Sequence, residues 1–407
     1  MSGRILITDA EERAALAACR GLSAAGYRVT AAACRRPAPT HWSRTCAERV
    51  GLPDPRAGTL RFAAGLEERL SRGDYAALIA GSDASLLAIS EHRARLEPLT
   101  RLGLPPPEAV QRSVDKVLLL QAAASAGLAA PPSRSCAERS EAAAAAAELG
   151  YPVVVKPARS FLRSGDGLRQ QRVTVADDEA ALEAAVRSYA PPFIVQRFEQ
   201  ARFVSSTGVI ADGRLLALTT SRVSRLWPPT AGMHTFSETI APSPRLADGI
   251  RALLGELGWE GIFQLQMFER SDGRLSVIDL NPRLFASMTL DQSAGANLAA
   301  IWCDWLLGGR PKPVMARAGY RYRWEEGELC HLAWQVRRAR FRAAAAVLVP
   351  HRRVAHAWFR AGDPAPLLAR ALQLGVRAVE KRIRGAPPAR KRPPVPAVLN
   401  QPASRGR

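Results

Sequence analysis

The chain has 407 residues, 47% of them hydrophobic, a composition that excludes a disordered protein and predicts two or three globular subdomains. Lysine and arginine number 57 against 37 aspartate and glutamate, so the formal net charge is +20. Such a charge suits nucleic acid, acidic lipid or anionic small molecules as partners. The six cysteines are far apart and form no Cys-x-x-Cys pair, and the first residues lack the apolar core of a signal peptide. We therefore expect free thiols in a cytoplasmic protein without a membrane span.

The first 105 residues predict an α/β layer. An apolar run at 4–8 predicts a strand, a helical pattern follows it, and 27–34 predicts a second strand. The turn at 9–12 contains no glycine, so we reject a dinucleotide site of the Gly-x-Gly-x-x-Gly kind. In the next strand–turn–helix unit, Ser82 or Asp83 could cap the helix, or the helix start could bind an anion.

A proline-rich linker at 103–110 precedes a helix that carries Lys116 in its first turn. We expect Ser113 to cap this helix and Gly127 to end it. A cation in the first turn opposes the helix dipole, so an anionic ligand beside Lys116 would explain its position. A lysine that simply points into solvent is the alternative.

Residues 151–155 predict a strand that delivers Lys156 at its end. The loop at 158–168 follows, and its two glycines, Gly165 and Gly167, allow backbone N–H groups to turn toward phosphates. A lysine at a strand end beside such a loop is well placed to reach a nucleotide.

Two further segments complete the middle of the chain. A strand at 193–195 leads into Gln196-Arg197-Phe198-Glu199, and a hairpin is predicted around residues 211–213. We expect a loop within 221–240, which contains Arg222 and His234. A structural role is favoured for this histidine over a catalytic one.

Residues 261–287 hold the most informative pattern. Two apolar runs flank a polar break that ends at Gly273, which is typical of a β-hairpin. Because side chains alternate along a strand, Gln266, Asp279 and Asn281 can converge on one face as oxygen donors if the two strands pair. Such donors suit Mg²⁺ or Mn²⁺ shared with a polyphosphate.

Arg283 lies just beyond the second strand of this hairpin, where its guanidinium could bind phosphate oxygens. A surface hairpin whose polar residues merely alternate is the alternative interpretation.

The order and spacing of these motifs resemble the ATP-grasp ligases. Residues 278–283, Ile-Asp-Leu-Asn-Pro-Arg, are similar to the Glu-x-Asn-x-Arg ending of their metal hairpin. Gln266 resembles the first metal ligand in the carbamoyl-phosphate synthase large subunit. The Val-Val-Lys-Pro run at 154–157 and the Asp-Lys pair at 115–116 match earlier motifs of the family. The resemblance covers about residues 106–310. It implies a mixed α/β (α+β) fold, in which an ATP-grasp domain follows a Rossmann-like pre-ATP-grasp domain.

The resemblance also implies ATP and Mg²⁺ as cofactors and assigns roles to residues. Contacts to the nucleotide are implied for the two lysines, the two loop glycines, the hinge backbone and a ribose-binding carboxylate: Lys116, Lys156, Gly165, Gly167, Gln196, Arg197, Phe198 and Glu199. Metal ligation is implied for Gln266, Asp279 and Asn281. Arg283, with Arg222 as a helper, would stabilise the transferring phosphoryl group.

The activity that follows is ligation. ATP would phosphorylate a carboxylate, and an amine or similar nucleophile would attack the acyl phosphate and release phosphate. The expected partners are small molecules and no specific nucleic acid, because the chain lacks a zinc finger or RNA-binding signature.

Three departures from the family keep rival interpretations open. Asp279 stands where glutamate is usual, the loop at 158–168 has only two glycines, and Arg202 replaces a residue that is often acidic. An ATP-binding protein without turnover is one rival. A basic protein that binds nucleic acid or a membrane surface is the other, motivated by the net charge.

The domains expected are 1–105 for the pre-ATP-grasp part and 106–310 for the ATP-grasp part, with a small lobe at about 113–200 and a large lobe at about 201–310. Residues 311–385 are expected to form a basic helical accessory region, with a possible peripheral membrane or protein contact. The Pro/Arg/Lys-rich tail at 386–407 is expected to be disordered.

Overall fold

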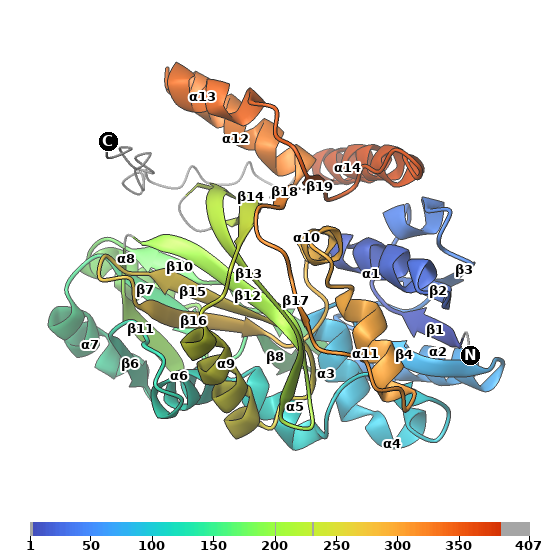
Figure 1. Cartoon of the computed structure of the whole chain (residues 1–407). Helices are drawn as coiled ribbons and strands as arrows, with labels where there is room; N and C mark the ends of the chain where they lie inside the picture. Colours follow the sequence, from blue (N-terminus) through green and yellow to red (C-terminus); the bar gives the residue numbers. More distant parts are fainter. Residues whose placement is uncertain (1–2, 200, 230–231, 384–407) are drawn as a thin grey trace.

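Five parallel strands form the sheet of the N-terminal domain, in the order β3-β2-β1-β4-β5 (Figure 1). The computed structural model describes residues 3–199, 201–229 and 232–383, and side chains through residue 380. Ile5 and Ile7 are fully buried, as expected for a central strand covered on both faces. The elements are β1 (Arg4–Ile7), α1 (Arg13–Ala24), β2 (Arg28–Ala33), η1 (Pro39–Trp42), β3 (Glu48–Gly51), α2 (Thr59–Ser71), β4 (Tyr75–Ile79), α3 (Asp83–Glu91), α4 (Arg93–Leu96) and β5 (Arg101–Leu102).

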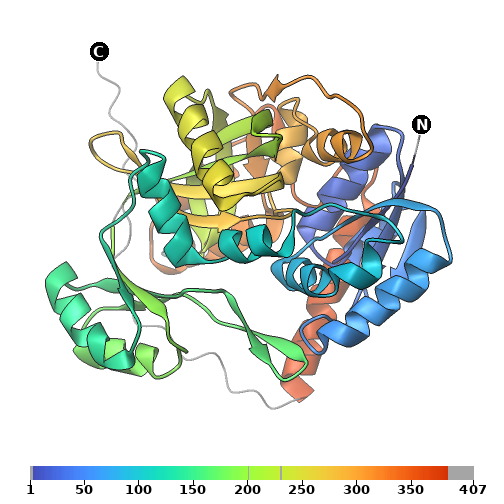
Figure 2. The same cartoon turned by 90° about the horizontal axis from the view of Figure 1, so that it is seen from below.

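A small lobe follows, built on an antiparallel sheet in the order β10-β7-β11-β6 that packs against α7 and α8. Its elements are β6 (Ser133–Cys136), η2 (Arg139–Glu141), α7 (Ala142–Leu149), β7 (Val153–Pro157), β10 (Thr174–Ala176), α8 (Glu179–Val186) and β11 (Phe193–Arg197). A separate hairpin, β8 (Phe161–Ser164) and β9 (Gly167–Gln170), extends from this lobe toward the N-terminal domain (Figure 2).

The large sheet has eight strands in the order β16-β15-β12-β13-β14-β18-β19, with β17 paired to β13. One face packs against α6 and α9, where Ile250 and Leu265 are fully buried. Helices α10 and α11 lie between the large sheet and α1 of the N-terminal domain. The elements are α5 (Pro107–Ser113), α6 (Lys116–Ser125), β12 (Arg202–Ala211), β13 (Arg214–Trp227), β14 (Met233–Ile240), α9 (Pro244–Leu257), β15 (Gly261–Glu269), β16 (Leu275–Asn281), α10 (Met288–Ser293) and α11 (Leu298–Leu306).

The C-terminal region departs from the expected all-helical segment. It contains α12 (Glu325–Arg337), α13 (Phe341–Leu348) and α14 (Ala365–Ile383), but β17 (Val314–Met315), β18 (Arg321–Arg323) and β19 (Val354–His356) join the large sheet. Trp324 and Trp358 are buried beside Tyr322. These two tryptophans therefore form a core that attaches the helices to the sheet.

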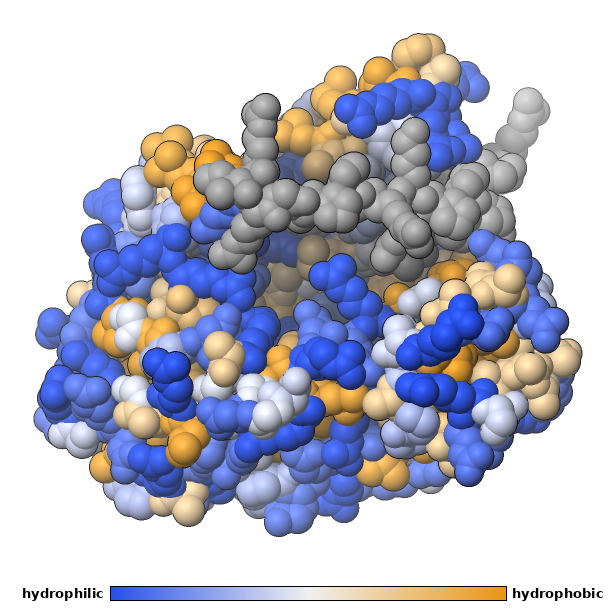
Figure 3. All heavy atoms as spheres, turned by 180° about the vertical axis from the view of Figure 1, so that it is seen from behind, coloured by the Kyte–Doolittle hydropathy of each residue, from blue (hydrophilic) through white to orange (hydrophobic). Residues whose placement is uncertain are grey.

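The outer ends of these helices carry apolar side chains at the surface. Figure 3 shows such surface at the upper end of the molecule, where α12 and α13 project. Phe341 is 67% exposed and Leu348 is 68% exposed. No helix in the described part of the chain has the length and apolar content needed to cross a bilayer. The membrane or protein contact expected for this region stays a prediction, and the tail at 386–407 lies outside the described residues.

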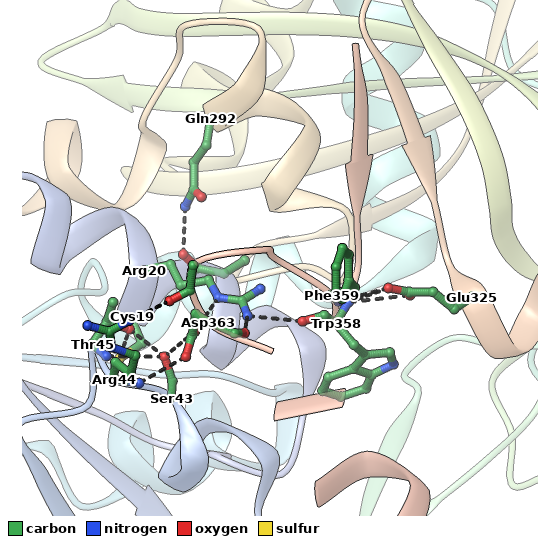
Figure 4. A network of polar contacts seen from close by, with 12 residues as sticks. Cys19, Arg20, Ser43, Arg44, Thr45, Gln292, Glu325, Trp358, Phe359 and Asp363 are labelled. Carbon is green, nitrogen blue, oxygen red and sulfur yellow. Dashed lines mark hydrogen bonds and ion pairs between the residues drawn. The ribbon is translucent and has the colours of Figure 1, made fainter. Parts of the chain in front are cut away.

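A buried ion pair fastens the C-terminal region to the N-terminal domain (Figure 4). Arg20 Nε on α1 donates to Asp363 Oδ2 over 2.9 Å, and both side chains are at most 5% exposed. Asp363 also accepts from Ser43 Oγ at 2.6 Å and from the backbone N–H of Arg44 at 3.0 Å. Arg20 further donates to the carbonyl of Trp358 at 3.0 Å. Both carboxylate oxygens of Asp363 thus accept hydrogen bonds from the N-terminal domain.

Three local predictions were wrong. Asp115, and not Ser113, caps α6, since its carboxylate accepts from the N–H of Val117 at 2.9 Å while Ser113 ends α5. The segment expected as a loop at 158–168 is largely the hairpin β8–β9, and the loop expected within 221–240 is mostly strand. Long polar strands and short arginine-rich hairpins lack the apolar alternation that identifies strands.

Asp291 on α10 is a buried carboxyl that accepts from Thr207 Oγ1 at 2.5 Å. Burial raises its pKa to about 7, against a partial lowering by the threonine hydroxyl. The folded state therefore favours the neutral acid, and its contribution to stability is complete at low pH and is lost as pH rises from about 4 to about 7.

The variant Asp291→Asn should remove this pH dependence. Above pH 7 this variant should unfold at a higher temperature than the wild type, because the amide needs no proton. The difference in unfolding free energy corresponds to about 1.4 kcal/mol for each pH unit that separates the folded from the unfolded pKa of Asp291. Melting curves from pH 4 to pH 8 measure the effect. Parallel pH profiles for variant and wild type would contradict it.

Candidate functional site

The hairpin of β15 and β16 presents its polar side chains on one face. Gln266 pairs with Asp279 and Gln264 pairs with Asn281, so these four residues lie side by side as expected. The intervening Leu265 and Leu280 face the buried core. Ile278 has no partner on β15, because the register shifts there by one residue. Such a bulge bends the strand and redirects the groups beside it.

Two lysines from different elements meet at this bulge. Lys116 Nζ, on α6, lies 3.0 Å from Asp279 Oδ1 and donates to Ser160 Oγ at 2.9 Å. Lys156 Nζ, on β7, donates to the carbonyl of Ile278 at 3.3 Å. Burial lowers the pKa of Lys156 to about 8, with the nearby charge of Asp279 opposing this change. Both ammonium groups are thus buried beside the only carboxylate of the predicted metal site.

Arg283 completes the group at the end of β16. Its Nη2 donates to Asn281 Oδ1 at 3.0 Å and to Asp83 Oδ2 at 2.9 Å. Burial would raise the pKa of Asp83, but the charge of Arg283 outweighs it, and this pKa lies below its usual value. We call Lys116, Lys156, Asp279, Asn281 and Arg283 the β16 cluster.

Asp83 was not among the predicted site residues. It was considered only as a cap of α3, and Ser82 performs that role, since its Oγ accepts from the N–H of Ser85. The signal available in the sequence was position: Asp83 follows a parallel strand at its carboxyl end, where α/β sheets bind ligands.

Three residues of the β16 cluster line a cavity of about 480 Å³ between the N-terminal domain and the ATP-grasp region. Its wall contains Lys116, Asp279 and Asn281, with Asp83 and Glu91 of the N-terminal domain on the other side. This volume lies within the range of sites for small molecules, about 300–1,000 Å³.

The hairpin β8–β9 forms part of the cavity wall and contacts the N-terminal domain. Arg163 donates to Thr59 Oγ1 at 2.7 Å and pairs with Glu91 at 2.5 Å. Gly165 has a φ of 60°, and a Cβ at Gly167 would collide with the carbonyl oxygen of Arg56. In this structure the two glycines therefore serve the turn and its contact with the first domain, and their contact with phosphate stays a prediction.

The hinge residues Gln196–Glu199 lie at the other end of the lobe interface. The side chains of Gln196 and Arg197 are engaged within the small lobe, with Ser133 Oγ at 2.9 Å and the Leu149 carbonyl at 3.0 Å. The N–H of Phe198 donates to the carbonyl of Pro152 at 3.2 Å.

Glu199 joins this hinge to the large sheet. Its Oε1 accepts from Arg270 at 2.9 Å, while its Oε2 is buried without a partner among the described residues. Arg270 lies in the turn between β15 and β16, so Glu199 contacts the same hairpin that carries Asp279 and Asn281.

Arg222 is not brought to the β16 cluster. It lies on β13 and pairs with Glu269 through two hydrogen bonds of 3.0 and 3.1 Å. His234 is buried against the ring of Phe203, and burial lowers its pKa to about 4. The catalytic role of Arg222 stays a prediction, which its ion pair with Glu269 does not support.

The chemistry of the donor set fits a divalent ion that is shared with phosphate. Asp279 Oδ1 is buried, and its ion pair with Lys116 lacks hydrogen-bond geometry. The described residues contain no group of three His, Cys, Asp or Glu side chains that could hold a metal unaided. One carboxylate with amide oxygens suits Mg²⁺, which binds few protein oxygens and takes the others from phosphates and water.

Comparisons with known proteins agree with this geometry. Residues 115–303 match the family described as the carbamoyl-phosphate synthase L chain, ATP binding domain. The N5-carboxyaminoimidazole ribonucleotide synthase of Mycobacterium tuberculosis is 29% identical over 232 residues, which cover 52% of each chain. The carbamoyl phosphate synthase large chain of Methanothrix thermoacetophila is 25% identical over 260 residues, covering 60% of this chain and 21% of that protein.

Solved structures show the same architecture. N5-carboxyaminoimidazole synthetase from Staphylococcus aureus superposes with a TM-score of 0.60 at 14% identity, covering 78% of this chain and 80% of that one. A biotin carboxylase complex from Campylobacter jejuni gives a TM-score of 0.60 at 18% identity, covering 79% and 74%. The L-amino acid ligase from Bacillus licheniformis gives 0.55 at 16% identity, covering 75% and 74%.

Residues 115–303 match the ATP binding domain of the carbamoyl-phosphate synthase L chain, as the motifs predicted. The fold of the chain is that of the solved ATP-grasp structures. The chain spans 21% and 52% of the lengths of the two curated relatives described above, so their complete activities are not transferred to it.

Proposed function

We propose that this protein is an ATP- and Mg²⁺-dependent ligase that activates a carboxylate as an acyl phosphate, releases ADP, and joins the acyl group to an amine or similar nucleophile. The observation that carries the proposal is the β16 cluster itself, three of whose members, Lys116, Asp279 and Asn281, line one cavity. The two buried ammonium groups share the single carboxylate of Asp279, while Arg283 pairs with Asp83, so the lysines need a further anionic partner, and a triphosphate supplies it. The ATP-grasp relatives support the same choice.

The position of each residue in the site suggests its role. Lys156 and Lys116 would bind phosphate oxygens, and Glu199 would accept hydrogen bonds from the ribose hydroxyls through its free Oε2. Arg283 would stabilise charge on the phosphoryl group as it transfers, held in place by Asp83. Mg²⁺, held by Asp279, Asn281 and Gln266, would neutralise the phosphates when bound. The cavity beside Asp83 would hold the carboxylate substrate and exclude water from the acyl phosphate.

The products test the mechanism. With a carboxylate substrate present, the protein should convert ATP into ADP and phosphate, and hydroxylamine should capture the acyl group as a hydroxamate. A panel of small acids, each tested with and without a panel of amines, identifies the substrate. Formation of AMP and pyrophosphate would refute the acyl phosphate, because it requires attack at the α-phosphorus.

Lys156→Ala should weaken ATP binding by about tenfold or more, because it removes a buried, charge-assisted contact to phosphate. Calorimetric titration with a non-hydrolysable ATP analogue measures the affinity. Arg169→Ala, an exposed substitution on β9, is the control and should bind like the wild type. A Lys156→Ala variant that melts normally and keeps full affinity would remove this lysine from the site.

A non-catalytic ATP-binding protein is the alternative function, and the relatives do not favour it. The ion pair between Lys116 and Asp279 motivates it, because this pair occupies the carboxylate that the metal requires. Absence of ATP turnover across the complete acid and amine panel, with intact nucleotide binding, would establish this alternative function.

A further inference from the structure

Four lysine and arginine side chains are buried in the described part of the chain: Arg13, Arg20, Lys116 and Lys156. Arg20 is paired with Asp363 and Lys116 with Asp279. Lys156 belongs to the β16 cluster. Arg13, which is 7% exposed, has no carboxylate within ion-pair distance among the described residues. A buried charge without a counter-charge is costly, so the position of Arg13 requires an explanation.

The contacts of Arg13 are all with neutral groups. Its Nη1 donates to the hydroxyl of Tyr322 at 3.1 Å and its Nη2 to Met233 Sδ at 3.4 Å. The guanidinium carbon lies 3.9 Å from the ring centroid of Trp324. These contacts fix the direction of the guanidinium without neutralising it, which leaves donors for an anion.

Three carboxylates on the segments that adjoin Arg13, Tyr322 and Trp324 in the sequence have other contacts. Glu11 accepts from Cys34 Sγ at 2.7 Å. Glu325 accepts from the backbone N–H groups of Trp358 and Phe359 at 3.1 and 2.9 Å, and Glu326 is paired with Arg370. Each of these three carboxylates thus already has another contact.

The location of Arg13 is that of a ligand-binding residue. It begins α1, which follows β1 at the carboxyl edge of the parallel sheet, and such edges bind ligands in α/β folds. Glu12, the N-cap of α1, makes no side-chain capping bond, so the first turn keeps backbone N–H groups for an anion.

A chain of contacts links Arg13 to the β16 cluster. The Tyr322 hydroxyl that accepts from Arg13 itself donates to the carbonyl of Ala286 at 3.2 Å, three residues beyond Arg283. Arg13 and Arg283 are thus held on the same side of the large sheet, next to the N-terminal domain. His234 lies near Arg13, and its Nε2 is buried without a partner among the described residues.

We propose that Arg13 binds an anionic group of the small-molecule substrate, a carboxylate or a phosphate, at a position separate from the nucleotide phosphates. The proposal rests on the proposed function and narrows its substrate to molecules that carry an anion in addition to the reacting group. A bidentate guanidinium contact suits both anions. Tyr322 and Trp324 position the guanidinium, and the first turn of α1 adds backbone donors.

The test is a thermal-shift titration of the complete protein with its nucleotide site saturated by a non-hydrolysable ATP analogue and Mg²⁺. The probes are inorganic phosphate, acetate, succinate, citrate and L-glutamate at constant ionic strength. At least one probe should raise the melting temperature of the wild type in a saturable way. A larger shift with phosphate than with the carboxylates indicates a phosphate site, and the reverse indicates a carboxylate site. In Arg13→Gln the apparent Kd for that probe should rise about tenfold or more.

Arg20→Gln is the matched control, because it removes a buried arginine from the same helix. It should lower the melting temperature by leaving Asp363 unpaired, yet keep the anion-dependent shift. Arg13→Gln should show the opposite pattern. Its melting temperature without anion should stay close to that of the wild type, and the anion-dependent rise in melting temperature should be lost. Equal shifts in wild type and Arg13→Gln, or no shift of the wild type with any probe, would overturn the proposal. Nucleotide binding, measured separately by the analogue alone, reports on the proposed function independently.

Discussion

Replacing Asp279 by asparagine should lower the rate of ADP formation on the order of 10²–10³-fold while ATP affinity changes by less than about tenfold. Asp279 is the single carboxylate among the predicted metal ligands, and it lies 3.0 Å from the Lys116 ammonium. The amide keeps the shape of the side chain but removes the negative charge that holds a divalent ion between protein and phosphates. Lys116 and Lys156 remain to bind the triphosphate.

The measurement combines turnover at saturating ATP with a titration of Mg²⁺. The half-saturating Mg²⁺ concentration should rise in the Asp279→Asn variant. Asp272→Asn is the matched control, since this carboxylate lies in the turn of the same hairpin and pairs only with Arg274. Turnover of Asp279→Asn within about threefold of the control would exclude Asp279 from the reaction.

Removing the Asp363 carboxylate should destabilise the protein by about 3–5 kcal/mol, because Asp363→Ala leaves the Arg20 guanidinium buried without its counter-charge. Ser43 Oγ and the N–H of Arg44 also lose their acceptor. Thermal or urea unfolding of the Asp363→Ala variant measures the loss.

The double variant Arg20→Met with Asp363→Leu separates loss of the charge pair from loss of packing. Since both charges are then replaced by apolar groups of similar size, most of the stability should return. An Asp363→Ala variant that unfolds with the wild type would show that the junction contributes nothing to stability.

The nucleotide-binding part of the fold could be predicted because its chemistry is local in sequence. The hairpin at 261–287 carries alternating polar residues and a glycine turn, and the register places Gln266 opposite Asp279 as that alternation requires. The two lysines lie at a helix start and a strand end, positions that short motifs specify well. The fold class was confirmed by the comparisons.

Features that depend on distant pairs could not be predicted. Asp83 meets Arg283 across 200 residues, and nothing in either segment identifies the other. Strands β17, β18 and β19 contain two or three residues each, too few for a periodic pattern, so their addition to the large sheet was missed. Arg13 looks like one arginine among many until its burial and its neutral neighbours are known.

The junction between Arg20 and Asp363 also constrains when the protein can finish folding. The two residues are 343 positions apart, so the ribosome completes the entire ATP-grasp region before the partner of Arg20 emerges. At about 5–20 residues per second this interval is on the order of tens of seconds. During this interval the N-terminal domain exposes the surface that the C-terminal segment later covers, and the Arg20 guanidinium is still solvated. Only a chain that extends past Asp363 can bury this surface, so chains that terminate earlier leave it open to chaperones and proteases.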